Sequence, residues 1–162
     1  LAQHLQSYGF DVAGWSRNKK LLNGVTSYAG PEELESFLNR TDALCCLLPL
    51  TPDTQGILCH KNLSNLPKGA VLINAGRGEH LVVNDLLQLL DENHLRGAVL
   101  DVYKQEPLPT EHPLWQHSKV MMTPHSSAQS EYAPCVEKIG NTLQAITNNQ
   151  DPSGLVDRSR GY

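Results

Sequence analysis

The residue types that could do chemistry stand directly after short apolar runs. Arg77 lies between two glycines, Glu106 follows the run 98–102, and His125 follows the run 120–123. The planar fork of an arginine can donate two parallel hydrogen bonds to a carboxylate. A histidine that hydrogen-bonds a glutamate keeps one tautomer and has its charged form favoured, so it can donate a proton. These residues predict a site that binds a small carboxylate and transfers a proton; for Arg77 the alternative is an exposed side chain in a turn.

A second group of residues could bind a phosphate. Ser16 and Arg17 follow the apolar run 10–15, and Lys19 and Lys20 come shortly after them. At this place in a dinucleotide-binding unit an acidic residue binds the ribose 2′-hydroxyl of NAD, whereas an arginine accommodates the 2′-phosphate of NADP. The segment therefore favours NADP (NADPH) over NAD, and the alternative is a solvated basic loop.

The elements that must position these residues alternate along the chain. Short apolar runs predict five strands, at 10–15, 43–48, 70–75, 98–102 and 120–123. The middle runs have almost no polar alternation, which is typical of parallel strands covered on both faces. Helical patterns occur at 31–38, 84–90 and 128–148. The predicted fold is therefore α/β, a doubly wound parallel sheet of the Rossmann-like kind, in which ligands bind at the carboxyl edge.

The beginning of the chain departs from that pattern. Residues 1–8 have the pattern of an amphipathic helix that ends at Gly9. In a dinucleotide-binding unit a strand and a glycine-rich turn precede this helix, so we expect the domain to lack its first strand and glycine-rich loop. With the strand order 3-2-1-4-5-6 that strand is central, and we expect its loss to split the sheet rather than trim its edge.

Length and charge exclude several classes of function. The 162 residues suit one domain. Seventeen acidic and 13 basic residues give a net charge of -4 with no block of like charges, which argues against a nucleic-acid partner. No apolar run approaches the roughly 20 residues that span a bilayer, and no signal-peptide pattern is present, so we expect no membrane association and a cytoplasmic protein.

The cysteines and the remaining histidines are not expected to form a site. Cys45, Cys46, Cys59 and Cys135 lack the spacing of a metal or redox motif, which predicts reduced core thiols; a nucleophilic role for Cys135 is the alternative. Polar surroundings predict a surface position for six histidines: His4, His60, His80, His94, His112 and His117. No metal site is expected, because the last two have neither helical ligand spacing nor a suitably spaced acidic or thiol partner.

Several motifs together resemble the nucleotide-binding domain of the D-isomer-specific 2-hydroxyacid dehydrogenases. They are Leu48-Pro49-Leu50-Thr51-Pro52-Asp53-Thr54, Ile73-Asn74-Ala75-Gly76-Arg77-Gly78, Leu100-Asp101-Val102-Tyr103 with Glu106-Pro107, and Pro124-His125. Segments 15–17, 113–117 and 156–162 resemble the glyoxylate/hydroxypyruvate reductase A branch of that family. The resemblance implies a partial dinucleotide-binding domain at residues 1–148 and a C-terminal tail, 149–162, that returns to an absent substrate domain.

The resemblance also implies an activity, the NADPH-dependent reduction of small 2-oxoacids such as glyoxylate and hydroxypyruvate. Arg77 is similar to the family's substrate-binding arginine, Glu106 to the acid that pairs with the histidine, and His125 to the general acid/base. The implied cofactor-binding residues are Ser16, Arg17, Leu48, Pro49, Thr54, Ala75, Gly76, Arg77, Asp101, His125 and Ser127. Among them, Asp101 corresponds to the residue that holds the nicotinamide carboxamide. The complete enzyme is expected to be a homodimer.

Two other functions stay open at the level of sequence. A non-catalytic nucleotide-binding protein of the same fold, such as a nucleotide-sensing corepressor, can keep the arginine, the glutamate and the histidine. An inert truncated homologue is the other alternative. The Ser16-Arg17 pair and the absence of a long tail for partner motifs favour the enzyme over the corepressor.

Overall fold

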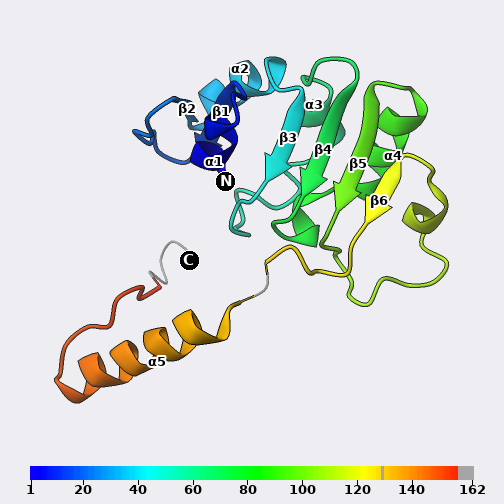
Figure 1. Cartoon of the computed structure of the whole chain (residues 1–162). Coiled ribbons are helices and arrows are strands. Elements are labelled where there is room, and N and C mark those ends of the chain that lie inside the picture. Colours follow the sequence, from blue (N-terminus) through cyan, green and yellow to red (C-terminus); the bar gives the residue numbers. More distant parts are fainter. Residues whose placement is uncertain (129, 157–162) are drawn as a thin grey trace.

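Parallel strands with helices between them make up most of the structure, a computed structural model that describes residues 1–128 and 130–156 (Figure 1). In chain order the α-helices and strands are α1 (Ala2–Ser7), β1 (Val12–Ser16), β2 (Val25–Ala29), α2 (Leu34–Asn39), β3 (Ala43–Cys46), α3 (His60–Leu63), β4 (Ala70–Asn74), α4 (Val83–Asp91), β5 (Leu95–Leu100), β6 (Val120–Met122) and α5 (Tyr132–Thr147). Short 3-10 turns lie at Pro31–Glu33, Gly78–His80 and Pro113–Gln116. The paired strands are all parallel, which confirms the predicted α/β class.

The strands form two separate sheets. β1 pairs with β2, and the second sheet has the order β3-β4-β5-β6. In the described part of the chain no strand lies between β1 and β3 to join the two sheets. The prediction that the sheet is split is therefore confirmed. β2 was not predicted, because its residues Val25-Thr-Ser-Tyr-Ala29 are short and partly polar.

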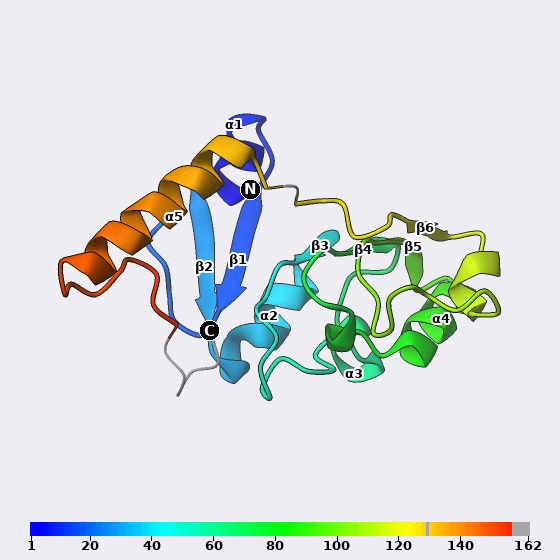
Figure 2. The same ribbon diagram turned by 90° about the horizontal axis from the view of Figure 1, so that it is seen from below.

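The hydrophobic core covers one face of the four-stranded sheet. Leu72 on β4 and Leu100 on β5 are fully buried, as are Leu86 and Leu90 on α4. Figure 2 shows α3 and α4 on the same side of this sheet. The residues that alternate with the core positions of β4 are half-buried, and Met121 on β6 is 64% exposed. Coverage of both faces, predicted from the apolar runs, is therefore found on one face only among the described residues.

The last helix, α5, is shorter than predicted and has no buried residue. Its apolar side chains Val136, Ile139 and Leu143 are 60–64% exposed, and Figure 1 shows the helix apart from the four-stranded sheet. The predicted tail, 149–162, lies outside the described residues from position 157 onward. None of the helices that the structure describes is long and apolar enough to cross a membrane.

The four cysteines are all free, but they differ in burial. Cys46 is buried and Cys45 and Cys59 are half-buried, in keeping with the predicted core thiols. Cys135 is exposed, so the core position predicted for it is wrong. The reason is its place on α5, where no residue is buried.

Candidate active site

Three neighbouring strands end at one edge of the four-stranded sheet, which we call the carboxyl edge. Asn74 at the end of β4 pairs with Leu100 at the end of β5, and Leu100 pairs with Met122 at the end of β6. Parallel register therefore brings the loops that follow these strands together, as Figure 1 shows at the arrowheads of β4, β5 and β6. Arg77 and His125 belong to the first and last of these loops.

A hydrogen bond joins His125 to Glu106 at this edge. The two atoms, His125 Nδ1 and Glu106 Oε2, are 2.8 Å apart, and the other carboxylate oxygen accepts the backbone N–H of Tyr103 at 2.9 Å. The bond from His125, with that from Tyr103, lowers the pKa of Glu106 below its usual value. The carboxylate therefore stays ionised and fixes the imidazole through Nδ1. The expected contact is present, while its catalytic role stays a prediction.

Asp101 holds the loop that carries His125. Its carboxylate accepts hydrogen bonds from the N–H groups of Ser126 and Ser127, at 2.9 and 3.0 Å, and from the hydroxyls of Thr123 and Ser127. Although burial opposes ionisation, these bonds hold the pKa of Asp101 well below its usual range. His125 itself has a φ of 51°, in the left-handed region that non-glycine residues seldom adopt. The bonds on both sides of the histidine therefore stabilise an otherwise unfavourable backbone.

Arg77 lies beside a groove formed by the loops after β3 and β4. This groove, of about 600 Å³, is lined by Leu47, Leu48, Pro49, Leu50, Ala75, Gly76 and Arg77, and we call it the Arg77 groove. Arg77 is exposed, and its Nη1 donates to the carbonyl of Gly76 at 2.7 Å. In the part of the chain that the structure describes, no hydrogen bond joins Arg77 to Glu106 or His125. Five of the predicted site residues thus line one groove. Arg77 and His125 lie at the same edge of the sheet, but no hydrogen bond joins them among the described residues.

The other predicted cofactor residues form two local structures. Thr54 closes the loop after β3, because its hydroxyl donates to the Pro49 carbonyl at 2.7 Å and accepts the N–H of Thr51 at 2.8 Å. Ser16 is the last residue of β1, and its hydroxyl donates to the carbonyl of Asn18 at 2.7 Å. Arg17 follows it and is exposed. These two residues lie at the end of β1 in the other sheet and are not among the residues that line the Arg77 groove.

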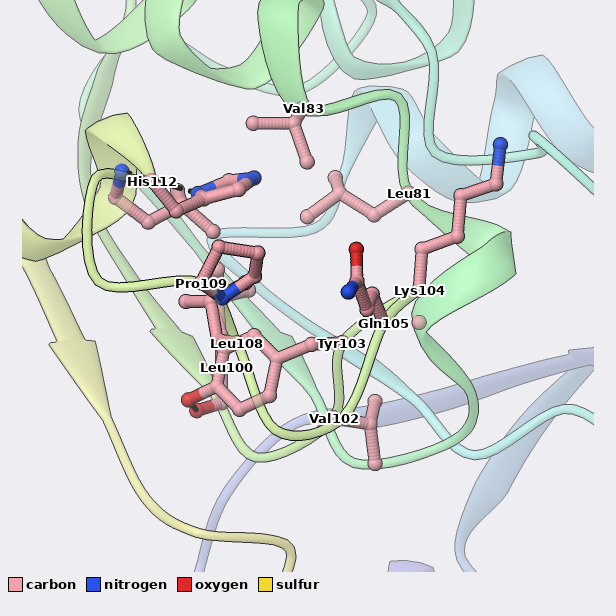
Figure 3. A pocket seen from close by; sticks show the side chains of 12 residues that line it. Leu81, Val83, Leu100, Val102, Tyr103, Lys104, Gln105, Leu108, Pro109 and His112 are labelled. Carbon is pink, nitrogen blue, oxygen red and sulfur yellow. Dashed lines mark hydrogen bonds between the residues drawn. The ribbon is translucent and has the colours of Figure 1, made fainter.

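The sequence did not predict that Tyr103 has a structural role at the carboxyl edge. Its hydroxyl lies 2.9 Å from the carbonyl of Leu100 and 3.0 Å from that of Thr123, so it links the ends of β5 and β6. The backbone of Tyr103 also approaches Gly78, where an added Cβ would meet its carbonyl carbon at 1.9 Å. Only glycine fits there. The loop after Tyr103 encloses a mainly apolar cavity of about 300 Å³, around which Figure 3 shows side chains including Leu81 and Leu108.

A second residue that sequence reasoning misplaced is His80. Its polar neighbours predicted a surface position, but it is 0% exposed, and that prediction is wrong. The structure buries the ring because it finds hydrogen-bond partners there: the N–H of Arg77, at 3.1 Å from Nδ1, and the carbonyl of Pro49, at 3.3 Å from Nε2. Among the other histidines predicted at the surface, His4 is exposed, and the rest are half-buried: His60, His94, His112 and His117.

Acidic, histidine and cysteine side chains do not gather into a metal site within residues 1–128 and 130–156. The groups that could act on a ligand here are a histidine held by a carboxylate and an exposed arginine. This set can bind an anion and exchange a proton with it.

Comparison with known proteins places this geometry in a family. Residues 1–127 match the family described as D-isomer specific 2-hydroxyacid dehydrogenase, NAD binding domain. A glyoxylate/hydroxypyruvate reductase A from Salmonella paratyphi B is 46% identical over 162 residues, which are all of this chain and 52% of the relative. The chain thus spans about half the length of the curated relatives it matches.

Solved structures show the same likeness. A 2-hydroxyacid dehydrogenase from Xanthobacter autotrophicus, in complex with NADPH, superposes with a TM-score of 0.96 at 37% identity, covering 99% of this chain and 66% of that one. An NADPH-dependent glyoxylate/hydroxypyruvate reductase from Sinorhizobium meliloti, in complex with NADP, gives 0.93 at 38% identity, covering 99% and 52%. These identities and scores agree with the Rossmann-like fold described above.

Proposed function

The chain belongs to the family of D-isomer-specific 2-hydroxyacid dehydrogenases, and on that premise we propose that it is the C-terminal part of an enzyme that reduces small 2-oxoacids with NADPH. Glyoxylate and hydroxypyruvate are the proposed substrates, in line with the relatives named above. The observation that carries the proposal is the 2.8 Å hydrogen bond between His125 and Glu106 at the carboxyl edge, which also bears Arg77. A proton donor and an anion binder at one edge match what the reaction needs.

In the proposed reaction each residue of the site has a separate role. The nicotinamide, when bound, supplies the hydride that reduces the substrate carbonyl. Arg77 binds the substrate carboxylate with its guanidinium and so orients the carbonyl. The Glu106 carboxylate accepts a hydrogen bond from the Nδ1–H of His125 and stays ionised, and the other ring nitrogen, Nε2, delivers a proton to the oxygen that becomes the hydroxyl. Asp101 keeps His125 in place through the loop that it holds.

NADP fits the residues present, on two observations. The Arg77 groove has the apolar and glycine-lined walls, Leu48, Pro49, Ala75 and Gly76, that a nicotinamide ring would contact. The exposed Arg17 at the end of β1 carries the positive charge that a 2′-phosphate requires. Ser16 would bind beside it, and Thr54, Asp101 and Ser127 would complete the site. NAD is the less favoured cofactor because no acidic residue stands at positions 16–17.

The remaining parts of the proposal concern the complete protein. Residues 1–148 would be a part of the dinucleotide-binding domain, and 149–162 would return to a substrate domain. The assembly would be a homodimer, which sedimentation of the complete protein can test. The cytoplasm is the proposed compartment, in keeping with four free cysteines.

The experiment that tests the proposed function follows NADPH oxidation by the complete protein with hydroxypyruvate and with glyoxylate. Turnover is expected with the wild type. Reduction should slow at high pH, where the His125 imidazolium loses its proton. In Glu106→Gln this slowing should begin at a lower pH, because the imidazolium loses the anion that stabilises it. A protein that binds NADPH but turns over neither acid would support the non-catalytic alternative. An unchanged pH profile in Glu106→Gln would remove the role assigned to the pair.

A further inference from the structure

The buried His80 lies behind the Arg77 groove, and its ring contacts both walls of it. Nδ1 accepts the N–H of Arg77, on the wall that follows β4, and Nε2 bonds the carbonyl of Pro49, on the wall that follows β3. A backbone N–H can only donate and a carbonyl can only accept, so the ring carries its proton on Nε2. Each ring nitrogen thus holds a different wall.

The space around the ring is closely filled. A Cβ added at Gly76 would lie 3.1 Å from Nδ1 of His80 and 3.3 Å from the carbonyl oxygen of Leu48. The Gly76 backbone therefore packs against the imidazole at a distance that a larger residue would disturb. Cys46 Sγ lies 3.7 Å from Nδ1 on the core side, where burial raises the pKa of the thiol and keeps it neutral. The ring has a fixed place between the two loops.

The backbone of Arg77 depends strongly on this histidine. Its N–H is bonded to the His80 ring, and its carbonyl accepts the backbone N–H of His80 at 3.2 Å and the side-chain amide of Asn74 at 3.1 Å. The guanidinium, by contrast, is exposed, and among the described residues its hydrogen bond is to the carbonyl of the adjacent Gly76. The peptide that His80 holds therefore fixes the point from which the Arg77 side chain extends.

We infer that His80 is a positioning residue, which fixes the backbone of Arg77 relative to Pro49 and so sets the geometry of the Arg77 groove for the substrate carboxylate. The inference rests on the proposed function for the identity of the ligand, a small 2-oxoacid. The link between the two loops is a property of the chain itself. It can be measured without any ligand.

Three substitutions in the complete protein separate the two bonds. His80→Ala removes both, His80→Asn keeps an acceptor near the place of Nδ1, and His80→Gln keeps a donor near the place of Nε2. The first readout is hydrogen exchange of the Arg77 amide, without cofactor or substrate. The exchange should be about tenfold faster in His80→Ala and His80→Gln, as expected for loss of one hydrogen bond, and close to wild type in His80→Asn.

The second readout is kinetic. Arg77 binds the carboxylate and orients the carbonyl, so His80→Ala should raise the KM for the 2-oxoacid and lower kcat by a smaller factor. The expected rise is about tenfold. His94→Ala is the matched control. His94 is half-buried, and its buried ring nitrogen Nε2 has no partner among the described residues. It follows α4, away from the carboxyl edge.

The outcomes separate the inference from the proposed function. Equal changes in KM for His80→Ala and His94→Ala, or an unchanged Arg77 amide in His80→Ala, would overturn the positioning role. If His80→Ala does not fold, the Asn and Gln variants decide, because Arg77 exchange that is the same in both contradicts the inference. If the wild type reduces no 2-oxoacid, the proposed function fails, while the exchange of the Arg77 amide still decides whether His80 holds this residue.

Discussion

The carboxyl edge of the four-stranded sheet and the ends of the chain differ in how their residues are held. All buried residues that the structure describes lie between Leu38 and Leu114. Within that span and at its edge, side chains form hydrogen bonds with the backbone of nearby loops: Asp101 with the loop that carries His125, and His80 with two loops. In α1, β1, β2 and α5, by contrast, no residue is buried.

The difference separates two requirements of the proposed enzyme. The groups proposed to bind and protonate the substrate are organised by contacts made inside this chain. Arg17, the residue proposed to select the cofactor, follows β1 of the two-stranded sheet, and in the part of the chain that the structure describes this sheet is not paired with β3. We therefore expect substitutions at the carboxyl edge to act on chemistry and on the stability of this chain. Substitutions at the ends should act on cofactor binding or have little effect.

The largest effect is expected for His125→Ala in the complete protein. Removal of a general acid lowers kcat by about 10²- to 10⁴-fold, while the dissociation constant of NADPH should stay almost unchanged. His117 provides a control, because it also contacts a carboxylate, Asp91 at 3.3 Å, but lies outside the carboxyl edge. Steady-state kinetics and NADPH titration measure both. Similar losses of kcat for His125→Ala and His117→Ala would contradict the assignment.

The next effect contrasts the stability of the two regions within the 162-residue chain. Leu72→Ala removes a fully buried side chain and should lower the free energy of unfolding by about 2–5 kcal/mol. Leu143→Ala on α5 removes a side chain that is 60% exposed and should change it by less than about 0.5 kcal/mol. Urea unfolding of both variants checks the contrast. Comparable losses would mean that α5 is packed as firmly as the core.

A smaller effect is expected at the cofactor-selecting end. Arg17→Ala in the complete protein should raise the Michaelis constant for NADPH by about 10- to 150-fold, the range for losing a charge-assisted bond to phosphate. The constant for NADH should change far less. Lys68→Ala is the control for charge, since Lys68 is an exposed cation that precedes β4 at the opposite end of the sheet. Equal effects on NADPH and NADH would sink the proposed 2′-phosphate contact.

The smallest effect concerns acid stability. The pKa of Asp101 is lowered in the fold, so its contribution to stability is full above the unfolded-state value of about 3.9 and is lost as pH falls through the lower folded value. Asp101→Asn should therefore be less stable than wild type at neutral pH but lose less stability below about pH 4. Urea midpoints between pH 7 and pH 3 provide the measurement. Parallel curves for the two proteins would show that the carboxylate does not contribute as described.

Sequence patterns predicted the sheet well because parallel strands such as β4 and β5 contain unbroken apolar runs, Ala70–Ile73 and Ala98–Leu100. They missed β2, where serine and threonine interrupt a short run. The site was anticipated where a residue follows a strand, as His125 and Arg77 do, because topology then brings it to the edge. His80 could not be placed from sequence, since its burial depends on the carbonyl of Pro49, 31 residues away in the chain. The exposure of α5 likewise depends on what packs against it, which its apolar spacing does not specify.

The most direct test of this contrast is residue-resolved hydrogen exchange of the 162-residue chain. We predict that the amides of Ser126 and Ser127, which bond Asp101, exchange as slowly as those of β4 and β5. The amides of β1, β2 and α5 should exchange faster by on the order of 100-fold, because these elements have no buried residues to hold them closed. Uniform exchange across the chain, or rapid exchange at Ser126 and Ser127, would contradict the claim that the carboxyl edge is organised by this chain's own contacts.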